Sequence, residues 1–200
     1  MEFAVIENGV DLQQFSPSPD SPVRDAPVVL FVSRLIERKG LHFLLAALAR
    51  MKDRVPRFQL VVAGDGPLRA QLEAQANSLG LGDRVRWLGN VPHDRLPDVY
   101  RSADIFVLPS LSEGMANVAL EAAASGLPLV LTDVPGTAEL LVHGRNGFVV
   151  APADVESLAN AIERLLLDPH LRRRMGQASR EVVRYLALFE QAISEWRATK

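Results

Sequence analysis

The sequence predicts an α/β protein with a Rossmann-like, doubly wound sheet of about six parallel strands flanked by helices. Short runs of apolar, often β-branched residues recur along the chain, and none alternates apolar with polar side chains, which is typical of strands buried on both faces. Between these runs, leucines recur at the spacing of helices that bury one face. Strands and helices that alternate in this order form parallel sheets, and right-handed crossovers place helices on both faces.

The expected elements follow one another without an internal repeat. One short helix is expected over residues 115–125, where Gly126 stops it, and a C-terminal helix from residue 169 to near residue 196. The six expected strands cover residues 28–32, 58–63, 85–88, 104–108, 128–132 and 147–150. The other expected helices are marked by Leu41, Leu44, Leu45 and Leu48, by Leu68, Leu72 and Leu79, and by Leu158, Ile162, Leu165 and Leu166.

One domain, residues 28–200, is expected after a linker-like N-terminal segment, residues 1–27. A chain of 200 residues is long enough for a single good core. Four prolines between Ser16 and Pro27 fix φ and remove backbone donors, which disfavours regular structure in that stretch.

The composition excludes several classes of site and partner. The formal net charge is −2, so we expect no nucleic-acid partner, which would require a concentrated basic face. The chain contains no cysteine, which excludes disulfides and thiolate metal sites. No run approaches the ~20 apolar residues that span a bilayer, and residues 1–10 lack the features of a signal peptide. A cytoplasmic protein is therefore expected.

Ligand chemistry is expected at the carboxyl ends of the strands, where open α/β sheets bind their ligands. After the first strand, Arg34 and Lys39 share one loop, and a guanidinium and an ammonium group there suit phosphate oxygens. After the second strand, Gly64 and Gly66 allow close backbone approach, but Arg69 stands where a dinucleotide-binding fingerprint has its third glycine. Solvated cations and a plain tight turn are the alternative interpretations of these two loops.

The loop after the fourth strand is the most informative. Glu113 and Gly114 lead into a helix that opens at Met115, Ala116 and Asn117. The free amides and the positive dipole end of a helix start form an anion site without a metal. A carboxylate beside a phosphate site is unfavourable unless it binds another group, such as a sugar hydroxyl.

Two further residues complete the predicted site. Glu121 lies more than one turn inside that helix, among alanines and a leucine, which argues for a closely packed position. Val91 follows Gly89 and Asn90 after the third strand, where exposed backbone suits a planar base. The alternative interpretation is that Glu113 and Glu121 are both solvated helix acids.

Taken together, these segments resemble the C-terminal domain of family 4 (group 1) retaining glycosyltransferases, which have the GT-B fold. The resemblance runs from Val5 to about Val183, and the ordered set of motifs is far more specific than any one motif. Ser33 departs from it, since the family usually has glycine there. The matching motifs are Val5 to Asp11 with Phe15, Arg34-Leu35 with Lys39-Gly40, Gly64-Asp65-Gly66-Pro67, Trp87 to Val91, Glu113 to Glu121, Gly126-Leu127-Pro128 and Gly144 to Phe148.

The resemblance implies a role for each predicted site residue. Arg34 and Lys39 would hold the diphosphate of a nucleotide-sugar donor, linked to UDP or GDP, and Glu113 would bind hydroxyls of the donor sugar. These three residues would form the catalytic set, with no cofactor and no metal, because positive charge stabilises the leaving nucleoside diphosphate. Glu121 would bind the ribose and the Val91 backbone the base. The other donor contacts would come from Gly64, Gly66, Gly114, Met115, Ala116 and Asn117.

The resemblance also implies a missing partner, the N-terminal domain that holds the acceptor. We therefore expect a hexosyltransferase of polysaccharide biosynthesis whose isolated donor domain is inactive, with any contact to the inner face of the membrane made through the absent domain. The alternatives are a non-catalytic nucleotide-binding module and a GT-B-fold nucleotide-sugar epimerase. A nicotinamide-binding domain is disfavoured by the missing fingerprint. On this reasoning, Glu113→Gln should weaken binding of the sugar conjugate and hardly alter affinity for the free diphosphate.

Overall fold

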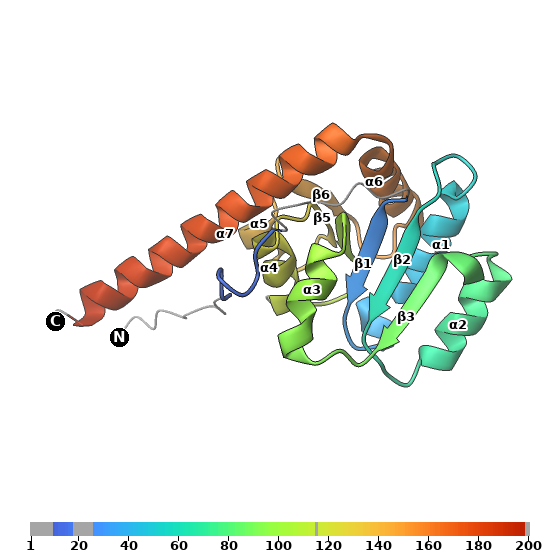
Figure 1. Ribbon diagram of the computed structural model, residues 1–200, viewed down its shortest axis with the longest axis horizontal. Helices are drawn as coiled ribbons and strands as arrows, with labels where there is room; N and C mark the ends of the chain where they lie inside the picture. Colours follow the sequence, from blue (N-terminus) through green and yellow to red (C-terminus); the bar gives the residue numbers. More distant parts are fainter. Residues whose placement is uncertain (1–9, 18–25, 115, 199–200) are drawn as a thin grey trace.

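The computed structural model is a six-stranded parallel sheet with helices on both faces, which confirms the predicted fold class (Figure 1). It describes residues 10–17, 26–114 and 116–198. The strands are β1 (Val28–Val32), β2 (Gln59–Ala63), β3 (Val85–Gly89), β4 (Ile105–Leu108), β5 (Leu129–Thr132) and β6 (Gly147–Val150). The helices are α1 (Leu41–Met51), α2 (Arg69–Ser78), α3 (Leu96–Arg101), α4 (Asn117–Ala124), α5 (Thr137–Leu140), α6 (Val155–Leu167) and α7 (Pro169–Ala198), with 3₁₀ turns η1 (Glu37–Lys39), η2 (Gly82–Arg84) and η3 (His93–Arg95).

The strand order is β3-β2-β1-β4-β5-β6, so the sheet is doubly wound. All strand pairs are parallel, and Leu30 of β1 lies opposite Val61 of β2 on one side and Phe106 of β4 on the other. The chain winds outward from β1 in its first half and outward from β4 in its second. The switch point therefore lies between β1 and β4, and the loops that follow these two strands border the crevice where ligands bind.

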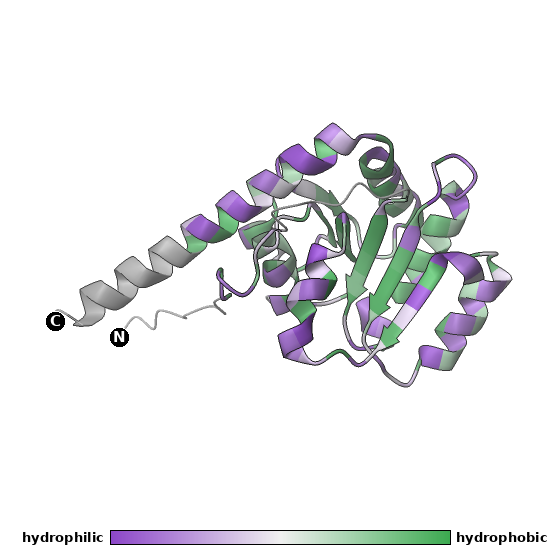
Figure 2. Ribbon diagram, viewed as in Figure 1, coloured by the Kyte–Doolittle hydropathy of each residue, from purple (hydrophilic) through white to green (hydrophobic). Residues whose placement is uncertain are grey.

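The central strands are buried because helices cover both faces of the sheet. Every residue of β1, β4 and β5 is buried, whereas β3 lies at the edge and is only partly buried. Figure 2 shows the matching difference in hydropathy, since β1 is hydrophobic and β3 includes hydrophilic residues. On one face α1 packs against α2 and α6, and on the other α4 packs against α3 and α7. The predicted face of α6 is buried, and Asp154 caps this helix by accepting hydrogen bonds from the amides of Glu156 and Ser157 at 3.1 and 3.0 Å.

Part of the expected linker-like segment packs on the domain. Phe15 is fully buried, and Arg180 of α7 donates hydrogen bonds to the carbonyl oxygens of Leu12 at 2.9 Å, Phe15 at 2.5 Å and Ala124. Residues 10–17 are thereby tied to α4 and α7. Residues 1–9 and 18–25, which include the first five residues of the Val5 to Asp11 motif, lie outside the described residues.

Candidate functional site

The loops that follow β1 and β4 are locked together by backbone contact. Gly40 has φ +72°, and a Cβ atom at this position would lie 2.0 Å from the carbonyl oxygen of Pro109. Only glycine permits both this conformation and this approach. Beside it, the amide of Leu111 donates to the carbonyl oxygen of Arg38 at 2.7 Å. The two predicted phosphate and sugar loops are therefore one rigid unit.

Within this unit, Lys39 and Glu113 form an ion pair. The Lys39 Nζ atom lies 2.5 Å from Oε1 of Glu113, and the side chains are only 14% and 11% exposed. The Ser110 hydroxyl donates to the same Oε1 atom at 2.6 Å, and neither bond uses Oε2. The resemblance places Lys39 on phosphate and Glu113 on sugar, but their contact with each other was not predicted from the sequence. The available signal was that both follow strands that meet at the switch point.

Three predicted residues line one groove, with a volume of about 550 Å³. Arg34 is exposed at its edge, after β1, and Gly64 and Val91 reach it from the ends of β2 and β3. Gly64 has φ +140°, and a Cβ atom there would lie 1.9 Å from the carbonyl oxygen of Ser33, so this glycine also serves the packing of the two loops. Gly66 is not among the groove-lining residues, and its amide donates to Oδ1 of Asp65 at 2.7 Å.

Helix α4 begins slightly later than predicted. Ala116 is the N-cap, with extended backbone at φ −85° and ψ 101°, and Asn117 is the first helical residue and is exposed. Met115 lies outside the described residues, so its predicted donor contact is not placed. The difference is local, because an N-cap residue keeps non-helical dihedral angles while its carbonyl oxygen joins the helix.

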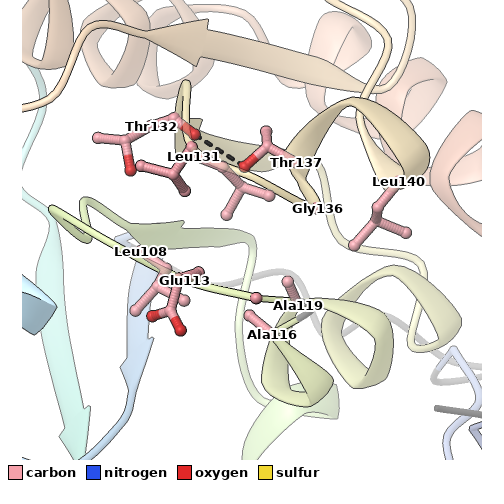
Figure 3. Close-up of a pocket in the computed structure, with 11 residues that line it drawn as sticks. Leu108, Glu113, Ala116, Ala119, Leu131, Thr132, Gly136, Thr137 and Leu140 are labelled. Carbon is pink, nitrogen blue, oxygen red and sulfur yellow. Dashed lines mark hydrogen bonds between the residues drawn. The ribbon is translucent and has the colours of Figure 1, made fainter. Parts of the chain in front are cut away.

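A small cavity of about 20 Å³ lies behind the loop that precedes α4 (Figure 3). Glu113, Gly114 and Ala116 line it from one side, and residues at the end of β5 and in α5, including Thr132 and Thr137, line the other. The volume is close to that of one water molecule and far below that of a hexose. In Figure 3 the Glu113 carboxylate points away from Thr132 and Thr137.

Glu121 is not a solvated helix acid. Only 8% of its surface is exposed, and its Oε2 atom accepts a hydrogen bond from the hydroxyl of Tyr100 at 2.8 Å. Its Oε1 atom lies 3.4 Å from Nε2 of His93, at the start of η3. Neither partner was predicted from the sequence, since they precede Glu121 by 21 and 28 positions on other elements and neither forms a motif with it.

The described residues contain neither a candidate metal cluster nor a candidate membrane-spanning helix. None of their His, Asp and Glu side chains gather in groups of three or more that could hold a metal ion. Within the same part of the chain, no helix combines the length and the apolar character needed to cross a membrane.

The sequence of this chain matches a known protein family. A model of the family described as glycosyl transferases group 1 matches residues 15–182, most of the chain. The chain belongs to this family. A GDP-mannose-dependent alpha-(1-6)-phosphatidylinositol monomannoside mannosyltransferase of Mycolicibacterium smegmatis is 36% identical over 187 residues, which cover 86% of this chain and 49% of that protein. This group 1 chain thus spans about half the length of such curated relatives.

Solved structures place the group 1 chain within the GT-B fold. Anabaena HepE in complex with UDP and glucose has a TM-score of 0.84 and 28% identity, over 98% of this chain and 57% of that one. The C-terminal domain of the group 1 protein LpcC from Francisella tularensis has a TM-score of 0.80 and 27% identity, over 88% of this chain and 97% of that domain. The chain therefore corresponds to the C-terminal domain of a group 1 enzyme, as the resemblance predicted.

Proposed function

We propose that this domain binds the nucleotide-sugar donor of a retaining, metal-independent hexosyltransferase, whose acceptor is held by an N-terminal domain outside this chain. The observation that carries the proposal is the convergence of three anchoring points at the carboxyl ends of the strands. These are the groove with Arg34, the ion pair of Lys39 and Glu113, and the buried Glu121. The sequence separates them, and the doubly wound topology brings them to the same edge.

The diphosphate is assigned to Arg34, Lys39 and the start of α4. Arg34 is exposed and offers a planar fork of donors, and Lys39 has three donors, so its bond to Glu113 leaves others for phosphate. The amides of Ala116 and Asn117 would add the positive end of a helix dipole. As the bond between the sugar and the diphosphate breaks, its electron pair stays with the leaving oxygen. Fixed positive charge stabilises that oxygen, the role that a metal ion fills in other enzymes.

The nucleoside is assigned to the groove and to Glu121. The backbone of Val91, which lines the groove, would meet the base, and the Glu121 carboxylate would accept hydrogen bonds from the ribose hydroxyls. The UDP bound by HepE and the GDP-mannose named for the mycobacterial relative support these two nucleotides as candidates.

The donor sugar is assigned to Glu113 because, among the residues that the structure describes, Lys39 and Ser110 bond its Oε1 atom and none bonds Oε2. Hydrogen bonds from sugar hydroxyls to this oxygen would orient the anomeric carbon above the phosphates. Retention of configuration is supported by the alpha linkage in the name of the mycobacterial relative, since an α-linked donor that gives an α-linked product retains its configuration.

The remaining parts of the proposal concern the whole enzyme. We place it in the cytoplasm and in polysaccharide biosynthesis, with any membrane contact made by the N-terminal domain. A donor domain alone would bind nucleotide without transferring sugar, because the acceptor is not positioned.

Calorimetric titration of this chain with UDP, GDP, UDP-glucose and GDP-mannose tests the proposal. Binding of at least one nucleotide pair is expected, and Lys39→Ala should weaken it by about tenfold or more, the value of a charge-assisted hydrogen bond. Arg54→Ala, which removes a cation at the far end of α1, is the matched control. Absence of binding to all four compounds, with the fold intact by circular dichroism, would refute a donor-binding role.

A further inference from the structure

The carboxylate of Glu121 is held by a buried phenol. Tyr100 of α3 is completely buried, and its hydroxyl donates to Oε2 of Glu121 at 2.8 Å. The same hydroxyl lies 3.1 Å from the carbonyl oxygen of Val118, but an ionised carboxylate is the stronger acceptor. Burial, and then the charge of Glu121, raise the pKa of the Tyr100 phenol well above its ordinary value. The phenol therefore keeps its proton and is a permanent donor.

The other oxygen of Glu121 points toward the nucleotide side. Oε1 lies 3.4 Å from Nε2 of His93, and His93 is 66% exposed, just beyond Val91 of the groove. Phe15 packs edge-on against the rings of both His93 and Tyr100, with centroids 5.6 and 5.7 Å apart. Phe15 thus packs against both residues that contact the Glu121 carboxylate, the buried Tyr100 and the exposed His93.

We propose that Tyr100 is a positioning residue for ribose recognition: its hydroxyl fixes Oε2 of Glu121 so that Oε1 faces the ribose hydroxyls. The inference rests on the proposed function, in which Glu121 binds the ribose. The terminal torsion of a glutamate is broad, so a carboxylate without a fixed partner rotates and loses direction. An ionised carboxylate has about four acceptor sites, and the phenol occupies one, which leaves enough for both ribose hydroxyls.

Tyr100 does not contact the donor nucleotide in this proposal, whereas Glu121 contacts its ribose directly. Loss of the phenol should leave the phosphate contacts intact, because Arg34 and Lys39 lie on a different loop, after β1, and the phenol bonds Val118 and Glu121 and not the amides of Ala116 and Asn117. The contribution of the ribose hydroxyls should fall while the contribution of the diphosphate stays the same. A residue that only filled the core would weaken all parts of the ligand alike or none of them.

The test compares Tyr100→Phe with the native chain by calorimetry, using UDP, 2′,3′-dideoxy-UDP and inorganic pyrophosphate, or the guanosine compounds if GDP is the tighter ligand. The native chain should prefer the ribonucleotide over the dideoxynucleotide by about tenfold, the value of a charge-assisted hydrogen bond. Tyr100→Phe should reduce the preference for the ribonucleotide at least threefold and leave the affinity for pyrophosphate unchanged. Tyr185→Phe, at the other tyrosine of the chain, which is 64% exposed, should change nothing.

The possible results separate the donor-binding role of the domain, the ribose contact of Glu121 and the positioning role of Tyr100. If the native chain binds neither nucleotide, the proposed function fails; if it binds both compounds equally, Glu121 does not read the ribose. If the native chain discriminates and Tyr100→Phe discriminates equally well, or loses affinity for all three probes alike, the positioning role alone is overturned. If Tyr100→Phe does not fold, the single variant Glu121→Gln is compared with the double variant that carries both Glu121→Gln and Tyr100→Phe. The double variant should fold, because a neutral amide at position 121 tolerates the loss of the Tyr100 hydroxyl better than a carboxylate does. Any further loss of ribose preference in that double variant would contradict action through Glu121.

Discussion

Removing the charge of Glu113 is expected to strengthen binding of the free nucleoside diphosphate. Lys39 is bound to Glu113 in this structure, and the diphosphate is proposed to bind the same ammonium group. The two anions then repel one another across Lys39. The change Glu113→Gln keeps the size of the side chain and removes this repulsion. Sequence reasoning alone gave a different expectation, no change, because it did not reveal the ion pair.

The size of the effect follows from the geometry. Two anions that each contact one ammonium group at hydrogen-bond distance lie about 6 Å apart. Their repulsion is roughly 0.7 kcal/mol in water and about 3 kcal/mol at an effective dielectric constant of 20. Because the pair is only slightly exposed, the repulsion should lie between these limits, so a gain of at least about 1 kcal/mol, or about fivefold in affinity, is expected. The sugar conjugate gains the same amount but loses a charge-assisted bond of about 1.5–3 kcal/mol, so its preference over the free diphosphate should fall at least tenfold.

The assay is a calorimetric titration of both ligands at low and high salt. The gain for the free diphosphate should shrink only slightly as salt rises, since charges that are mostly buried are screened much less than exposed ones. Glu163→Gln is the control, because it breaks an ion pair with Arg54 at 2.8 Å at the far end of α1. In the Lys39→Ala background the gain should persist, because the repulsion acts directly between the two anions. Unchanged or weakened diphosphate binding by Glu113→Gln would show that the ion pair does not compete with the ligand.

Three further changes test other parts of the reasoning. Arg34→Ala should weaken nucleoside diphosphate binding by about 1.5–3 kcal/mol in calorimetry, and unchanged affinity would remove Arg34 from the phosphate site. EDTA should leave nucleotide affinity unaltered, and a loss that magnesium restores would contradict a metal-independent site. Gly40→Ala should lower the free energy of unfolding by about 3 kcal/mol or more, because its Cβ would meet the Pro109 carbonyl. Gly144→Ala is the control: Gly144 has φ +79° and no neighbour within 4 Å, so its replacement should cost only about 1–2 kcal/mol of backbone strain. Equal losses in thermal unfolding would refute the role of the contact between Gly40 and Pro109.

The sequence by itself determined the class of fold and the candidate residues. All six strands lie within a residue of their predicted positions at each end, because runs such as Val28–Val32 are apolar throughout and tolerate no exposed face. The loop and helix from Glu113 to Glu121 could also be predicted from the sequence, since a loop, a helix start and a glycine at the helix end are local signals. Helix α4 starting at Asn117 and not at Met115 shows where local signals end, since a single N-cap decides it.

Only the tertiary structure decided how the candidates meet. The ion pair of Lys39 and Glu113 joins residues 74 positions apart, and the phenol of Tyr100 reaches Glu121 from another helix. Neither contact leaves a periodic pattern, because each depends on strand order and on the close approach of loops, such as Gly40 against Pro109. Sequence periodicity records which face of an element is buried. It does not record which other element covers that face. In this domain the arrangement of the elements brings Glu113 to Lys39 and Glu121 to Tyr100.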